Sequence, residues 1–201
     1  RKYLNKTQLI PHGLLSITPE SSTKPYSKPP NNNTLIYWGN IKPYKGIEFI
    51  RELSIHKNKK QIDINIEIFG KWSQELTSIK NELVDLKIKI SDKFLTEQEV
   101  LSLLDKEAVF ILPYKTATQS GAMYTLLNYG KYFIATDAGE IGRIFREHQL
   151  SNLLIDYNDP SSVETALKYL KENALDVQNK MQAIQEKCTW KNIIKNDFSF
   201  L

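Results

Sequence analysis

Residues 108–137 constrain the fold more than any other stretch of the sequence. Residues 108–112 form an uninterrupted apolar run, which is typical of a strand covered by helices on both faces, and Pro113 ends it. A polar turn then leads to Ser120, a residue type that caps helices, and residues 132–135 are mostly apolar again. Such a strand–turn–helix–strand unit presents free backbone N–H groups at the carboxyl edge of a parallel sheet, where they favour an anion such as phosphate.

Strand-like and helix-like segments alternate about six times along the chain. The predicted strands cover residues 34–39, 65–70, 86–90, 108–112, 132–135 and 152–156. This alternation predicts an α/β fold with a mainly parallel sheet of about six strands. Residues 1–33 are interpreted as a lead-in strand and a polar linker loop rich in Pro, Ser and Asn, so the domain itself is predicted to span residues 34–201.

The composition excludes several classes of protein. A hydrophobic content of 41% is typical of a globular chain, and the net charge of +4 is mild. The basic run at residues 57–60 is interpreted as solvated surface, so no nucleic-acid partner is predicted. The one cysteine, Cys188, permits neither an internal disulfide nor a zinc cluster, which fits a reducing compartment such as the cytoplasm. No apolar run approaches the roughly 20 residues that span a bilayer.

The glycines after the first predicted strand do not form a common nucleotide-binding motif. Residues 39–46 match neither G-x-G-x-x-G nor the P-loop, which disfavours NAD and ATP phosphate cradles. The sequence contains no His-Glu-x-x-His, Cys-x-x-Cys or Gly-x-Ser-x-Gly motif. Its three histidines lie far apart, and His12 could line a cleft or belong to an ordinary turn. No catalytic residue and no metal ligand is therefore predicted.

Seven short motifs occur in the order found in one protein family. They cover residues 10–13, 39–47, 68–70, 94–95, 112–121, 130–136 and 189–190. Together they resemble the C-terminal half of family 4 of the retaining nucleotide-sugar glycosyltransferases, also called glycosyltransferases group 1. The resemblance implies a GT-B fold, in which two Rossmann-like domains face each other across a cleft. It also implies that this chain is the three-layer Rossmann-like domain that binds the donor, and that an N-terminal acceptor-binding domain is its partner.

The resemblance implies a donor site with two parts. The diphosphate-binding residues are Gly39, Asn40, Lys45, Gln119, Ser120 and Gly121, and the base- and ribose-binding residues are Gly70, Phe94, Leu95 and Thr125. Lys45 matches a lysine that holds the diphosphate in the family, but Asn40 stands where the family has an arginine. This difference replaces a fixed fork of charged donors with one neutral amide. Phe94 could contact the base or pack in the core.

Two acidic residues of the family are absent from this chain. The first carboxylate of the family's Glu-x7-Glu pair contacts the donor sugar and the second holds the ribose, and these positions fall on Ala117 and Thr125. The chain resembles a looser variant of the family that carries Ser-Gly in this turn, here residues 120–121. Residues 139–141 resemble the family's Gly-Gly-Ile, and Arg143 follows where a glutamate is common.

The resemblance therefore implies the donor-binding domain of a glycosyltransferase that moves a sugar from a nucleoside diphosphate to a carbohydrate or glycolipid acceptor, with retention of configuration. The nucleotide sugar is the substrate, and no cofactor is expected. Without the acceptor-binding half we expect no activity, and any contact with a membrane would be peripheral, through that half. Two alternatives stay open. One is a degenerate domain that binds a nucleotide or a partner without transferring sugar, which the absent carboxylates favour; the other is a sugar-nucleotide epimerase of the same fold.

Overall fold

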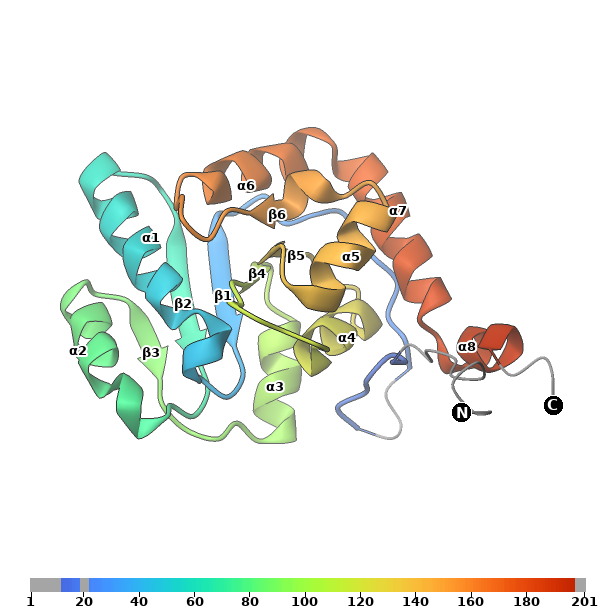
Figure 1. The fold of residues 1–201 in the computed structure, drawn as a ribbon, viewed down its shortest axis with the longest axis horizontal. Coiled ribbons are helices and arrows are strands. Elements are labelled where there is room, and N and C mark those ends of the chain that lie inside the picture. The colour runs from blue at the N-terminus through green and yellow to red at the C-terminus, as the bar shows by residue number, and fades with distance from the viewer. Residues whose placement is uncertain (1–11, 19–21, 198–201) are drawn as a thin grey trace, which may run out of the picture.

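The computed structural model describes residues 12–18 and 22–197, which form a six-stranded sheet with flanking helices (Figure 1). The strands are β1 Thr34–Trp38, β2 Asn65–Phe69, β3 Lys89–Ser91, β4 Val109–Leu112, β5 Phe133–Thr136 and β6 Leu154–Ile155. They lie in the order β3-β2-β1-β4-β5-β6, and every neighbouring pair is parallel. The predicted α/β fold is therefore confirmed, and the strand order is that of Rossmann-like domains.

Helices follow the strands along the chain and flank the sheet (Figure 1). The α-helices are α1 Ile47–Lys60, α2 Thr77–Asp85, α3 Glu97–Leu104, α4 Gly121–Asn128, α5 Gly139–Glu147, α6 Ser162–Glu172, α7 Ala174–Lys187 and α8 Trp190–Asp197. Three 3-10 turns are η1 Pro43–Lys45, η2 Gln74–Leu76 and η3 Ser151–Leu153. Because each parallel crossover returns the chain to the same edge, all loops that follow strands gather at one edge of the sheet.

The central strands are buried on both faces, which explains their continuous apolar runs. Every residue of β4 and β5 is buried, as are residues 35–37 of β1. The edge strand β3 has no buried residue. Continuous rather than alternating hydrophobicity is expected where helices cover both faces of a parallel strand.

The third predicted strand is displaced by the helix before it. Leu86 ends α2, and Lys87 adopts a left-handed conformation with φ of 60°. The chain therefore enters the sheet only at Lys89, and the strand covers Lys89–Ser91 rather than residues 86–90. Ile88 is buried at the end of α2, so its alternation with Leu86 marks a helix end and not a strand.

The chain before β1 packs against α4 and α7. Residues 12–18 and 22–33 contain no helix or strand. The Leu14 N–H donates to the Cys188 carbonyl at 3.0 Å, and the Gln178 amide of α7 donates to the Tyr26 carbonyl at 3.0 Å. Leu14 and Tyr26 are buried, so this polar stretch is held on the domain. The predicted lead-in strand before Pro11 lies outside the described residues.

Candidate functional site

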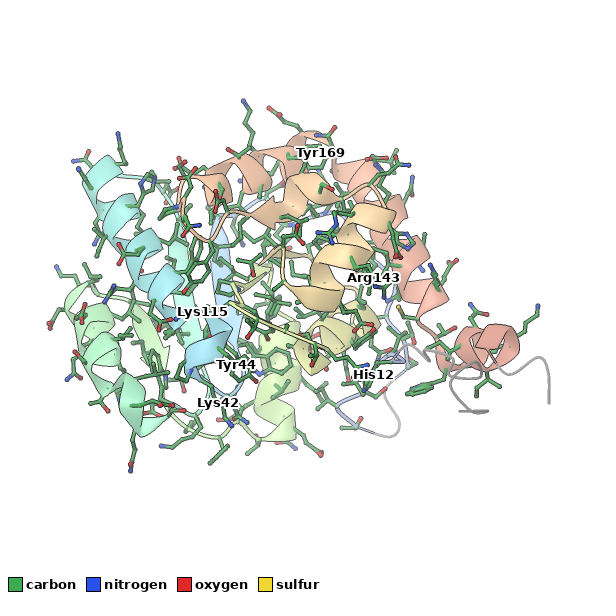
Figure 2. The ribbon with its side chains drawn as sticks, in the orientation of Figure 1. His12, Lys42, Tyr44, Lys115, Arg143 and Tyr169 are labelled. Atoms are coloured by element: carbon green, nitrogen blue, oxygen red, sulfur yellow. The ribbon has the colours of Figure 1, made fainter. Side chains whose placement is uncertain are left out.

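The loops that follow β1 and β4 face each other at the carboxyl edge of the sheet. In the observed strand order the chain runs outward from β1 on one side and from β4 on the other. Loops at such a switch point diverge and leave a crevice, which is the usual ligand site of open α/β sheets. Here the two loops cover residues 39–46 and 113–120. In Figure 2, Lys42 and Tyr44 mark the first loop, and Lys115 belongs to the second.

Two glycines allow loops at this edge of the sheet to approach each other closely. Gly46 has a φ of 73°, and a Cβ there would lie 1.7 Å from the Pro113 carbonyl oxygen. Gly70 has a φ of 138°, and a Cβ there would lie 1.8 Å from the Gly39 carbonyl oxygen. A side chain at either position would collide with backbone. Gly39 and Gly70, both predicted in the donor site, therefore shape the backbone of the crevice.

Lys45 is a half-buried cation without a carboxylate partner in the part of the chain that the structure describes. It ends η1, and its Nζ lies 5.6 Å from the ring centroid of Tyr114. A Cβ on Gly39 would lie 3.1 Å from the same Nζ, so the amino group sits beside the loop backbone. Burial, and next the charge of Lys42, lower the pKa of Lys45. A partly desolvated ammonium without a counter-ion favours a bound anion.

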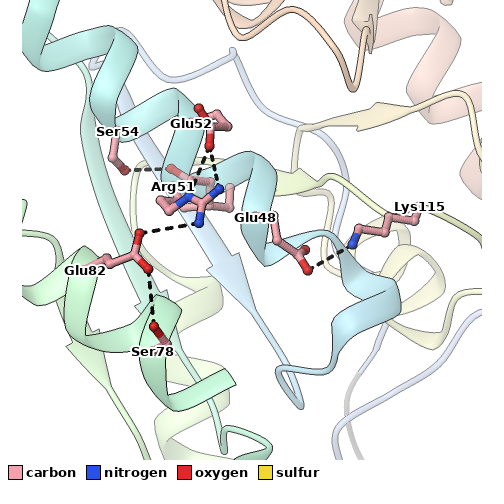
Figure 3. A network of polar contacts seen from close by, with 8 residues as sticks. Glu48, Arg51, Glu52, Ser54, Ser78, Glu82 and Lys115 are labelled. Carbon is pink, nitrogen blue, oxygen red and sulfur yellow. Dashed lines mark hydrogen bonds and ion pairs between the residues drawn. The ribbon is translucent and has the colours of Figure 1, made fainter. Parts of the chain in front are cut away.

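The neighbouring Lys115 is already neutralised by a carboxylate. Its Nζ lies 2.9 Å from Oε1 of Glu48 in the first turn of α1 (Figure 3). The hydrogen bond to Glu48 raises the pKa of Lys115. This pair ties the loop after β4 to α1, so Lys115 is occupied by a structural contact whereas Lys45 is free to bind.

Lys42 is a candidate that sequence reasoning missed. It is exposed in the loop after β1, and no described residue supplies it with a carboxylate partner. Its charge lowers the pKa of Lys45, so the two ammonium groups are close enough to attract the same anion. Asn40, where the family has an arginine, is exposed two residues earlier. The signal in the sequence was a second lysine in the loop that holds Lys45.

The start of α4 supplies the other side of the crevice. Ser120 is the N-cap, and its Oγ accepts the Met123 N–H at 3.2 Å, which confirms the predicted cap. The N–H groups of Gly121 and Ala122 have no acceptor inside the helix, and the helix dipole adds partial positive charge there. Gln119 is exposed just before the cap. This end of the helix can therefore accept an anion.

Tyr114 brings the two sides of the crevice together. Its side chain is buried, which raises its pKa to about 12, and its contact with Ser120 opposes the rise. Because Lys45 lies over the same ring, the ammonium group and the N-cap of α4 flank one aromatic side chain. Tyr114 is thus both a buried core residue and a neighbour of the two groups that would bind an anion.

The residues predicted to bind the base and the ribose differ in exposure to solvent. Phe94 is 72% exposed after β3, so it does not pack in the core, and Leu95 is half-buried. Thr125 is 5% exposed, and its hydroxyl donates to the Gly121 carbonyl at 3.0 Å. Phe94 is thus available to stack on a planar group, whereas the Thr125 hydroxyl is already engaged inside α4.

The described residues offer no metal centre and no membrane-spanning helix. Across residues 12–18 and 22–197, His, Cys, Asp and Glu side chains form no group of three or more that could hold a metal ion. Within those same ranges, every helix is too short or too polar to cross a bilayer.

The sequence matches a known protein family. A family model described as glycosyl transferases group 1 matches residues 32–173, which include both crevice loops. The chain belongs to this family. No curated protein matches it.

Solved glycosyltransferase structures share the fold of this group 1 chain. Sucrose-phosphate synthase from Thermosynechococcus elongatus aligns with a TM-score of 0.68 and 14% identity, over 98% of this chain and 54% of that one. The pneumococcal O-GlcNAc transferase in complex with UDP and GlcNAc aligns with a TM-score of 0.62 and 16% identity, over 89% of this chain and 37% of that one. The catalytic domain of cholesterol-α-glucosyltransferase from Helicobacter pylori aligns with a TM-score of 0.57 and 19% identity, over 79% of this chain and 100% of that one. The group 1 chain thus spans about half the length of the synthase and less of the O-GlcNAc transferase, and its architecture is that of one GT-B domain.

Proposed function

We propose that this group 1 chain is the donor-binding domain of a retaining glycosyltransferase, which takes a sugar from a nucleoside diphosphate and transfers it to a carbohydrate or glycolipid acceptor. The observation that carries the proposal is the Lys45 ammonium, which has no carboxylate partner among the described residues and flanks Tyr114 together with the start of α4. A diphosphate satisfies both sides of this crevice at once, because it accepts from the lysine and from backbone N–H groups.

The crevice would act on the leaving group of the transfer. When the bond from the sugar C1 to the diphosphate breaks, its electron pair passes to a phosphate oxygen, the acceptor oxygen bonds to C1, and the proton of the acceptor hydroxyl passes to an oxygen of the departing diphosphate. Lys45 and the N–H groups of Gly121 and Ala122 would stabilise the negative charge that develops on the diphosphate. Phe94 would stack on the base.

A second Rossmann-like domain that binds the acceptor completes the proposed enzyme. The partial coverage of the sucrose-phosphate synthase, 54% of that chain, supports such a partner. The protein would act in the cytoplasm and meet a membrane only through the second domain.

One observation favours a second candidate function. Ala117 has no polar side-chain atom, and the Thr125 hydroxyl is engaged by the Gly121 carbonyl. Neither position of the family's acidic pair therefore offers a free polar group, as expected of a degenerate domain that binds a nucleotide without transferring sugar.

Calorimetric titration tests whether the crevice recognises a diphosphate. We expect the chain to bind UDP or GDP and not uridine or guanosine, because Lys45 and the start of α4 contact only the phosphates. Equal binding of a nucleoside and its diphosphate, or binding of neither diphosphate, would contradict the proposed donor site.

A further inference from the structure

Glu140 carries a buried carboxylate oxygen to which no described residue donates a hydrogen bond of ordinary geometry. It is the second residue of α5, and its side chain is 10% exposed. Its Oε1 lies 3.6 Å from Nη2 of Arg143, beyond hydrogen-bond distance, and its buried Oε2 is hydrogen-bonded to no residue in ranges 12–18 and 22–197. Buried polar atoms are nearly always hydrogen-bonded, because an unmet one costs about 1–3 kcal/mol. A bound ligand that donates a hydrogen bond to this oxygen would remove the cost.

The surroundings of Glu140 contain a second unmet polar group. Tyr124 of α4 is fully buried, and no described residue gives its hydroxyl a hydrogen bond of ordinary geometry. Burial raises the pKa of Tyr124 most, and the charge of Glu140 and the approach of the hydroxyl to that carboxylate raise it further, so the two polar groups lie next to each other. His12 stacks on the Tyr124 ring with centroids 4.9 Å apart. In Figure 2, His12 and Arg143 both lie to the right of Lys42 and Tyr44.

Backbone contacts place Glu140 beside the proposed diphosphate site. The preceding Gly139 packs on the turn between β4 and α4, and a Cβ there would lie 1.5 Å from the Ala117 carbonyl oxygen. Ala117 is three residues before the N-cap Ser120, and Tyr124 is one helical turn beyond it. The Glu140 carboxylate thus borders the turn that would receive the diphosphate.

We propose that Glu140 binds hydroxyl groups of the sugar that the diphosphate carries, and so supplies from α5 the carboxylate that the turn lacks at Ala117. The inference rests on the proposed function, since a sugar enters only with a nucleoside diphosphate. A carboxylate accepts hydrogen bonds from hydroxyl groups, and such charge-assisted bonds are stronger than neutral ones. Arg143 orients Glu140 from the side, and the Tyr124 hydroxyl can donate to whichever oxygen the sugar leaves unmet.

The test compares affinities for a nucleotide with and without its sugar. The probes are UDP, UDP-glucose and UDP-N-acetylglucosamine, with GDP and GDP-mannose in parallel, titrated into wild type, Glu140→Gln and Glu140→Ala. We expect both variants to lower the affinity for a sugar-bearing nucleotide about tenfold or more and to leave that for the free diphosphate within about twofold. Retained binding of the diphosphate also shows that each variant is folded.

Glu147→Gln is the matched control, because it removes the other carboxylate that contacts Arg143. Glu147 pairs with Arg143 Nη1 at 2.7 Å on the same helix, and its side chain is 44% exposed. The Glu147→Gln variant should bind the free and the sugar-bearing nucleotides with the affinities of wild type. A loss in Glu147→Gln equal to that in Glu140→Gln, or equal losses for free and sugar-bearing nucleotides, would overturn the assignment of Glu140 alone. If wild type binds no diphosphate, the proposed function and this inference are both overturned.

Discussion

Burial makes the charged form of Lys45 unfavourable in the free protein, whereas a bound diphosphate makes it favourable. Burial lowers its pKa below the ordinary value of 10.5. The charged form therefore destabilises the free fold at every pH below the lowered pKa, and this cost disappears as the pH rises from the lowered pKa to 10.5. A bound diphosphate offsets the cost, because an adjacent anion favours the ammonium form. Such a residue is explained by binding and not by stability.

The lowered pKa of Lys45 predicts that diphosphate affinity depends on pH. Binding needs the protonated amine, so affinity should be complete below the lowered pKa and should fall as the pH rises through it, at a lower pH than for an ordinary lysine. UDP titrations from neutral to alkaline pH measure this fall. Lys45→Arg is the control, since arginine stays charged and the nucleotide's own titration is the same for both proteins. Parallel pH profiles in the two proteins would show that Lys45 does not contribute its charge.

The sequence predicts site residues where a local pattern points to them. Lys45 follows from the motif around Gly39 and Gly46, and Ser120 from its position before a helix. Glu140 could not be found in this way, because its burial and its missing hydrogen bond depend on Tyr124 and Arg143 packing beside it. Pattern reasoning sees residue types and spacing, whereas unmet polar atoms arise only from tertiary packing.

At the scale of elements, the crevice depends on how the loops after the strands fit together. The loop after β1 lies against the loop after β4 at Gly46, and the loop after β2 lies against Gly39 at Gly70. Strand positions were well predicted where both faces are buried, as in β4. They were poorly predicted at the sheet edges: β6 has only two residues, because η3 Ser151–Leu153 takes the first two residues of the predicted segment 152–156. A helix end or 3-10 turn that faces the core has the same apolar pattern as a short strand.

Replacing Gly46 should disrupt this fit. Gly46→Ala places a side chain at a φ of 73° and within 1.7 Å of the Pro113 carbonyl oxygen, so we expect a loss of at least about 2 kcal/mol in the free energy of unfolding. Chemical denaturation measures the loss. Gly121→Ala is the control, since a Cβ there would meet only Leu15 Cδ1 at an ordinary 3.4 Å. Equal stability of the two variants would contradict the close contact between the loops.

At the scale of the whole molecule, the domain has its own hydrophobic core but only one side of the proposed cleft. Among the described residues, fifty buried hydrophobic side chains form a single cluster that includes the sheet and part of the segment before β1. We therefore expect the chain to unfold in one cooperative thermal transition. A chain whose circular dichroism shows no such transition would contradict an independent fold.

The same reasoning predicts that the chain transfers no sugar alone while it still binds nucleotide. The described residues include a candidate diphosphate site but no residue to which we assign the role of general base. Assays with UDP-glucose or GDP-mannose and a panel of carbohydrate acceptors should therefore show no transfer. Turnover by the purified chain would contradict the proposal that a second domain supplies the acceptor site.

Calorimetric titration with UDP and GDP at fixed salt shows directly whether Lys45 binds a nucleoside diphosphate, when wild type, Lys45→Ala and Lys71→Ala are compared. A charge-assisted contact contributes about 1.5–3 kcal/mol, so Lys45→Ala should weaken binding about tenfold to hundredfold. Lys71 serves as the control, because its Nζ lies 3.3 Å from Asp92 and its side chain is 46% exposed, and Lys71→Ala should barely change the affinity. Equal affinities in all three proteins would remove Lys45 from the site and contradict the account.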